Sequence, residues 1–248
     1  MAFRQTVTAP PGLPLLRQLW RHLGFFHWPV EPDLISAVLP PGIDVDTFDG
    51  VAYLGLVPFT MVGTRPPFLP ALPGFSDFHE VNVRTYVHVG GRDPGVWFFS
   101  LDASSHLAVS GARALYKLPY FHASIAMAVH QDPIDVIDFR SSRNGAANLR
   151  CTYQPTGEVR PAQPDTLEFF LVERYLLYSW DGRRLRTARV FHQPYPLQTA
   201  RLNDGFEDTL VAQSGVARPD GPPPLAHYAR EVDARIYRPR VAREPSSA

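Results

Sequence analysis

Glu80, Asn82 and Arg84 stand at alternate positions of a stretch with the composition of a β-strand, separated by Val81 and Val83. In a strand the three polar side chains share one face and the valines take the other. A carboxyl, an amide and a guanidinium on one face suit a small ligand that carries a carbonyl or carboxylate group. Two interpretations remain open. Either the polar row faces water, or it lines an internal cavity while the valines pack outside.

Tyr120 and His122 alternate around Phe121 and would point to the same side of another strand. An imidazole beside a phenol is able to perform acid–base chemistry or to orient a ligand. The alternative is that both rings only pack, with incidental hydrogen bonds. Together with Glu80, these two residues are the catalytic candidates of the sequence.

Glu173 lies in a mostly apolar stretch, 167–179. A buried carboxylate needs a partner, which Arg84 or Arg113 would supply. The result is either a structural ion pair or an outer part of the pocket. The ligand-binding candidates are therefore Asn82, Arg84, Arg113 and Glu173.

Lys117 is the one lysine in the chain, beside 23 arginines. It falls at the end of a helix that we predict from Ser104 or Ser105 to about Tyr116, where an exposed cation interacts favourably with the helix dipole. An exposed helix-end lysine is one interpretation and a reactive amine is the other. No second lysine exists to activate it.

The elements that must position these residues are mainly strands. We expect helices over 13–22, 31–38 and 105–116, and a long loop, 64–76, that is rich in proline. Asp49-Gly50, Asn144-Gly145 and Asp181-Gly182 are typical of hairpin turns. We predict strands over 43–48, 51–59, 81–89, 96–101, 121–129, 134–139, 147–153, 167–179, 184–192 and 230–237.

This pattern predicts a mainly β (α+β) fold in which an antiparallel sheet curls or closes into a β-barrel, with a few short peripheral helices. One domain would span 13–238, between a flexible N-terminal arm, 1–12, and a flexible tail, 239–248.

Charge and composition argue against several functions. The 24 basic and 24 acidic residues cancel, which gives no electrostatic case for nucleic acid or for a membrane surface. A single cysteine, Cys151, excludes an intrachain disulfide or a cysteine-based metal centre. The sequence contains no metal-binding histidine spacing, phosphate-binding loop or dinucleotide motif, so we expect neither a metal nor a cofactor.

No apolar run reaches the ~20 residues of a membrane span, and the start does not resemble a signal peptide. We therefore expect a cytoplasmic protein.

Seven strings in combination resemble the YqjF-like family of bacterial proteins, within the acetoacetate decarboxylase superfamily. The resemblance covers about residues 20–237. The strings are HWPV at 27–30, LPPGIDVDTFDGVAYLGLVPF at 39–59, NVRTYV at 82–87, WFFSLDA at 97–103, LPYFHA at 118–123, ERYLLY at 173–178 and HQPYPL at 192–197.

The resemblance implies the superfamily's curled β-sheet with helices packed around it. In acetoacetate decarboxylases two consecutive lysines follow a proline. One of them forms a Schiff base with the keto acid, and its neighbour lowers its pKa. Tyr120 and Phe121 follow Pro119 here, and neither is able to form an imine. A catalytic glutamate of those enzymes is similar in context to Glu80. Superfamily members often assemble, and an exposed Phe25–Trp28 segment would suit the interface of a homo-oligomer.

Three functions follow as hypotheses. The first is a cavity that binds a small carbonyl or carboxylate compound, with any catalysis being lysine-independent acid–base work of the lyase or hydratase type. The second is a non-catalytic binding or assembly protein with a barrel filled by side chains. The third is an imine-forming enzyme that uses Lys117. An open cavity that touches Glu80 would favour the first over the second.

Overall fold

The structure is a computed structural model that describes residues 8–72, 76–131 and 133–242. Four helices lie in this part of the chain: α1 (Pro32–Ser36), α2 (His106–Tyr116), α3 (Leu167–Val172) and α4 (Leu210–Gln213). The strands of the same part are β1 (Leu16–Val30), β2 (Asp44–Val45), β3 (Ala52–Arg65), β4 (Phe78–Val89), β5 (Arg92–Ala103), β6 (Tyr120–His122), β7 (Ser124–Gln131), β8 (Asp135–Arg143), β9 (Ala146–Thr156), β10 (Leu176–Trp180), β11 (Leu185–His192), β12 (Leu197–Leu202), β13 (Glu207–Asp208), β14 (Leu225–Ile236) and β15 (Arg240–Val241).

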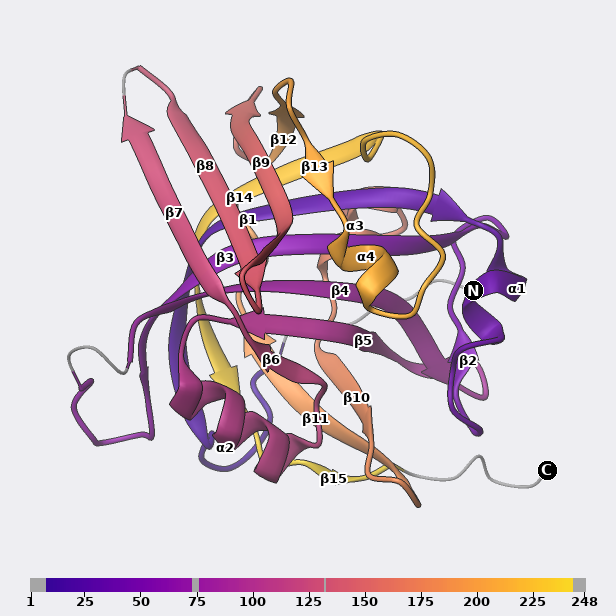
Figure 1. Ribbon diagram of the computed structural model, residues 1–248. Helices are drawn as coiled ribbons and strands as arrows, with labels where there is room; N and C mark the ends of the chain where they lie inside the picture. The colour runs from indigo at the N-terminus through magenta and orange to yellow at the C-terminus, as the bar shows by residue number, and fades with distance from the viewer. Residues whose placement is uncertain (1–7, 73–75, 132, 243–248) are drawn as a thin grey trace.

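Seven strands form a closed ring in the order β11-β10-β5-β4-β3-β1-β14, because β14 also pairs with β11. Most neighbours in the ring are antiparallel, but β5 and β10 are parallel. In Figure 1 the strands β1, β3, β4 and β5 cross the molecule one below another, and α2 lies beneath them beside β6. The predicted mainly β fold with a curled sheet and short helices is confirmed, and its sheet closes into this ring.

A second group of strands, which we call the wing, continues from β14 through β12, β9 and β8 to β7. In Figure 1 it rises above the ring. The outer face of the ring packs against it through a buried apolar cluster that includes Phe26, Leu54, Val81, Val83 and Phe139. A second cluster occupies the inside of the ring. The valines of β4 therefore pack outside the ring, between two layers of sheet.

The helix predicted over 13–22 is wrong, because the chain from Leu16 onward belongs to β1 and pairs with β3 and β14. The register of the β1–β3 pair shifts between Arg17 and Leu19 and again between Arg21 and Phe26, and His22 has a φ of 53°. An irregularity of this kind interrupts the two-residue alternation of a strand. The apolar residues of β1 consequently fall at spacings that imitate a helix.

The segment Phe25–Trp28 is buried, with Phe25, Phe26 and Trp28 each at most 1% exposed. Phe25 packs inside the ring, whereas Phe26 and Trp28 pack against the wing. The expectation of an exposed aromatic interface at this segment is therefore wrong. Its apolar side chains pack on both faces of β1.

Local signals located several elements correctly. Ser105 caps α2 by accepting a hydrogen bond from the Ala108 amide, and Asn144-Gly145 connects β8 to β9. The strand predicted over 167–179 is wrong in its first half, which forms α3 behind the capping Thr166. The hairpin predicted at Asp49-Gly50 is reduced to an isolated bridge, since β2 pairs with β4.

The chain ends and the long loop fall partly outside the described residues. The predicted tail contains β15, which pairs with β11, while 243–248 lie outside the description. The same holds for 1–7 of the predicted arm and for 73–75 of the 64–76 loop. Among the helices that are described, none has the length and apolar character needed to cross a membrane.

Candidate functional site

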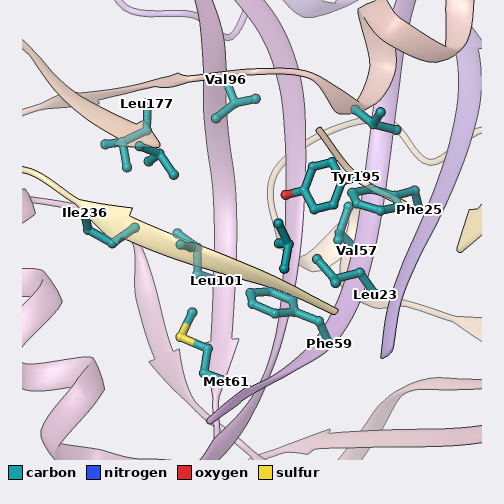
Figure 2. Packing of buried hydrophobic residues seen from close by; sticks show 14 of the residues in the cluster. Leu23, Phe25, Val57, Phe59, Met61, Val96, Leu101, Leu177, Tyr195 and Ile236 are labelled. Atoms are coloured by element: carbon teal, nitrogen blue, oxygen red, sulfur yellow. The ribbon is translucent and has the colours of Figure 1, made fainter. Parts of the chain in front are cut away.

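A cavity of about 460 Å³ lies inside the ring. Figure 2 labels some of the side chains that line it, which come from several strands of the ring and from the turn that carries Tyr195. They are Leu23, Phe25, Val57, Phe59, Met61, Val96, Leu101, Leu177, Tyr195 and Ile236. The walls are therefore mostly apolar, and the interior of the ring is not filled by side chains.

The polar row of β4 faces this cavity. Glu80, Asn82 and Arg84 all line it, and all three are at most 8% exposed. The alternating Val81 and Val83 pack toward the wing. Of the two orientations left open by the sequence, the structure thus has the one with the polar face inward.

Glu80 is the acidic group of the cavity. Its Oε2 accepts a hydrogen bond of 2.8 Å from the hydroxyl of Tyr120. Burial raises the pKa of Glu80 to about 8, although hydrogen bonds from Tyr120 and Asn82 act in the opposite direction. The Arg113 Nε donates to the Tyr120 carbonyl at 2.6 Å and thereby holds the short strand β6 in place. Near neutral pH the carboxyl group is mainly protonated, so it is able to donate as well as accept a hydrogen bond.

This raised pKa predicts a specific pH dependence of stability. The folded protein holds the Glu80 proton up to about pH 8, whereas the usual value is 4.5. Stability from this group is therefore complete below pH 4.5 and is lost as the pH rises to about 8, at up to about 1.4 kcal/mol per pH unit. Glutamine does not titrate, so Glu80→Gln should lack this pH-dependent loss, and its free energy of unfolding should rise relative to that of wild type toward pH 8.

Urea unfolding of both proteins at several pH values between 5 and 8 measures the difference. Glu158→Gln, at an exposed position, is the matched control. A constant difference between Glu80→Gln and wild type across this range would contradict the prediction.

Arg84 is the basic group of the cavity. Its guanidinium donates to the Leu171 carbonyl at 3.0 Å and lies 5.6 Å from the centre of the Phe25 ring. Its Nε has no hydrogen-bond partner, and no carboxylate of the described chain forms an ion pair with it. Gly55 stands opposite on β3, where a Cβ would lie 3.2 Å from the Arg84 Cγ. A glycine at this position therefore leaves room for the arginine.

Tyr86 and two histidines, His27 and His192, lie near Arg84 and were not among the site candidates of the sequence. The His27 Nε2 lies 2.7 Å from the Tyr86 hydroxyl, which donates to the Leu171 carbonyl at 2.5 Å. Burial and then the charge of Arg84 lower the pKa of His27 well below its usual value. Burial lowers that of His192 to about 4. These histidines are neutral near pH 7 and do not compete with Arg84 for an anion. His27 lies in the HWPV string and His192 in the HQPYPL string, but a local sequence pattern does not reveal which side chains the two histidines contact.

Glu173 lies apart from the polar row, in a smaller cavity of about 340 Å³ beside α3. The Tyr175 hydroxyl and the Tyr195 amide donate hydrogen bonds to its carboxyl group. Burial raises the pKa of Glu173. The predicted ion pair with Arg84 or Arg113 is absent from the described part of the structure. Arg174 lines both cavities and pairs with Asp46 at 2.6 Å.

Besides Glu173, three predicted participants lie outside the cavity lining. Arg113, expected to bind the ligand, is exposed on α2, and its Nε contacts the Tyr120 carbonyl instead. His122 is exposed and stacks on His106 with ring centres 3.5 Å apart, so the structure does not bring it to Glu80. Lys117 is exposed at the end of α2 in the left-handed conformation, with a φ of 56°. Its neighbours Tyr116 and Leu118 line the cavity instead. The position of Lys117 is that of the exposed helix-end interpretation. Across the described residues, no group of three or more His, Cys, Asp or Glu side chains is arranged to hold a metal ion.

Comparisons with known proteins agree with the resemblance seen in the sequence. Residues 17–233 match the family model DUF2071, described as an uncharacterized conserved protein. The chain is 36% identical over 234 residues to the uncharacterized protein YqjF of Bacillus subtilis, an alignment that covers 94% of this chain and 95% of that protein. The predicted relation to the YqjF-like family is confirmed.

Two solved structures share the fold at low sequence identity. The enduracididine biosynthesis enzyme MppR complexed with pyruvate matches with a TM-score of 0.66 and 14% identity, over 97% of this chain and 94% of that chain. Acetoacetate decarboxylase from Legionella pneumophila matches with a TM-score of 0.64 and 16% identity, over 97% and 94%. The ring of strands is therefore the acetoacetate decarboxylase-like fold.

Proposed function

This chain belongs to the DUF2071 family, and from that premise and the geometry of the cavity we propose that it binds a small organic carboxylate inside the ring of strands. The observation that carries the proposal is the buried guanidinium of Arg84, which has no carboxylate partner among the described residues and lines the cavity. An arginine side chain keeps its positive charge in proteins. Because a buried cation without a counter-ion is unfavourable, a carboxylate ligand would supply what the site lacks.

Other groups of the cavity complement such a ligand. The Oδ1 atom of Asn82 is buried without a hydrogen-bond partner and would accept a hydrogen bond from a hydroxyl or enol group. The protonated Glu80 would donate one to a carbonyl oxygen. MppR has been solved in complex with pyruvate, a keto carboxylate, and its similar fold supports this ligand class. No lysine lines the cavity, so the ligand would be held without an imine.

Calorimetric titration tests the proposal, with pyruvate, acetoacetate and longer carboxylates as ligands and the corresponding methyl ketones as uncharged controls. Binding of carboxylates in preference to ketones supports it. Full carboxylate binding by both Arg84→Ala and Glu80→Ala would overturn it, as would no carboxylate binding by the folded wild type.

A second candidate function, acid–base catalysis on the bound ligand, is favoured by the environment of Glu80. A carboxyl group with a pKa of about 8 is able to exchange a proton near neutral pH. Ionised Glu80 would take a proton from the carbon next to the ligand carbonyl, which leaves an enolate, and would then return it. The Tyr120 hydroxyl, which donates to Glu80, would hold the carboxyl group in position.

Deuterium exchange tests this step. In D2O the wild-type protein should accelerate exchange of the methyl protons of pyruvate, followed by proton NMR. Glu80→Gln should reduce the exchange rate at least about 100-fold, in the range of general acid–base contributions. Glu158→Gln should behave as wild type. Equal rates with wild type and Glu80→Gln would exclude Glu80 as the base.

A further inference from the structure

We propose that the carboxylate ligand carries a long apolar tail, as in a medium-chain fatty acid, and that its head group is held at Arg84 while its tail fills the remaining cavity. This inference rests on the proposed function and specifies its ligand class. The two are separable, because head-group binding depends on Arg84 whereas tail binding depends on the apolar wall.

The size of the cavity favours a ligand larger than a keto acid. At about 460 Å³ it falls in the range of about 300–1,000 Å³ that holds drug-sized molecules. Pyruvate would occupy only a small part of it. Burial of apolar ligand surface against apolar walls is favourable in proportion to the area removed from water.

The polar and apolar parts of the lining are separated in the way an amphipathic carboxylate requires. The charged groups are confined to β4 and to Arg174, whose charge is already paired with Asp46. The other lining side chains are predominantly aliphatic or aromatic, from β1, β3, β5, β10, β11, β14 and α2. A ligand with several polar groups would leave most of them without partners against this wall. One anionic head and an unbranched hydrocarbon tail match it.

The mouth of the cavity gives the direction of the tail. Leu107 and Leu115 of α2 line the cavity and are nevertheless 62% and 46% exposed, so the opening lies beside α2. Phe78, at the start of β4, pairs with Met61 at this end of the ring, and Arg84 lies six residues further in. The stretch from Glu80 to Arg84 spans about 13 Å of strand, which suits a chain of roughly ten carbons. A head group at Arg84 would therefore direct the tail toward α2, along the apolar side chains of the lining.

A chain-length series tests this ligand class. Isothermal titration calorimetry would compare acetate, hexanoate, octanoate and decanoate, with decanol as the uncharged control. Each added methylene should tighten binding about three- to four-fold while the tail still enters the cavity, the equivalent of roughly 0.8 kcal/mol per buried CH₂. Decanol should bind more weakly than decanoate in wild type, and Arg84→Met should remove that difference.

A matched pair of variants on α2 locates the tail. Ala112 lines the cavity and is half-buried, whereas Ala114 is exposed and does not line it. Ala112→Trp should weaken decanoate binding at least about ten-fold, and more than it weakens acetate binding. Ala114→Trp should leave both affinities as in wild type. Circular dichroism of the two variants verifies that they fold.

The outcomes separate the two proposals. If acetate and decanoate bind equally and both require Arg84, the long tail is excluded and carboxylate binding stands. If decanoate binds equally well to Arg84→Met, the proposed function fails together with this inference. If Ala112→Trp and Ala114→Trp weaken decanoate binding alike, the tail does not occupy this cavity and the inference is overturned.

Discussion

Arg84→Met should weaken binding of carboxylates at least about 30-fold, because the loss of a buried cation that pairs with a ligand anion costs about 2–5 kcal/mol or more. The same substitution should leave the free energy of unfolding unchanged or higher. Methionine is also unbranched but shorter and uncharged, so it replaces the apolar stem of the arginine without a buried cation that lacks a counter-ion. The Leu171 carbonyl, which Arg84 contacts, keeps its hydrogen bond from Tyr86. A group that weakens the fold and strengthens ligand binding is typical of a functional site.

Two further variants sharpen this test. Arg84→Lys keeps the charge but loses the planar fork of donors, so it should bind carboxylates with an affinity between those of wild type and Arg84→Met. Arg92→Met removes an exposed arginine at the start of β5 and should change neither property. The expectation fails if Arg84→Met binds carboxylates normally. It also fails if this variant is destabilised by several kcal/mol, since Arg84 would then be a structural residue.

Asp46→Leu should destabilise the protein by about 3–5 kcal/mol, because it leaves the guanidinium of Arg174 buried without its counter-ion. The Asp46 Oδ2 and the Arg174 Nη1 are 2.6 Å apart, and the two side chains are only 3% and 5% exposed. Arg174 cannot easily turn toward water, since its Nε donates to the Phe170 carbonyl at 2.8 Å and its guanidinium stacks 4.2 Å from the Phe170 ring. Urea unfolding at pH 7 measures the loss.

The double variant Asp46→Leu/Arg174→Met should recover most of that stability, because both charges are then removed together. Glu231→Ala breaks the exposed ion pair with Arg21 and serves as the control, with an expected cost of about 0–1 kcal/mol. If Asp46→Leu alone cost no more than this control, the buried pair would contribute little to the stability of the ring.

Local chemistry predicted the helix of the central region and the Asn144-Gly145 turn well. Ser105 begins α2, and Asn144-Gly145 connects two wing strands, because caps and tight turns depend on residues adjacent in sequence. The sequence of β1 has the spacing of a helix, because the irregular register of this strand interrupts its two-residue period. Short strands such as β13 and β15 have no period of their own, and their existence depends on the neighbours they pair with.

The residues of the candidate site were likewise predictable from the sequence only in part. Glu80, Asn82 and Arg84 share a face because they alternate along one strand, and that much follows from the sequence. Tyr120 meets Glu80 across 40 residues, and no local pattern predicts that contact. His122 has the same alternation as Tyr120, but it is the last residue of β6 and stacks on His106 outside the cavity lining. Alternation assigns a side of a strand, but it does not say how far a cavity extends along it.

The sequence by itself determined the period of β4, the absence of a lysine pair after Pro119 and the family to which the chain belongs. Only the tertiary structure decided that the polar face of β4 points inward, that Arg84 lies there without a carboxylate partner in the described residues, and that Glu173 is satisfied by Tyr175 and a backbone amide. The physical reason is the closure of the ring. The pairing of β11 with β14 joins segments far apart in the chain, and it is this long-range pairing that creates an inside for the polar row to face.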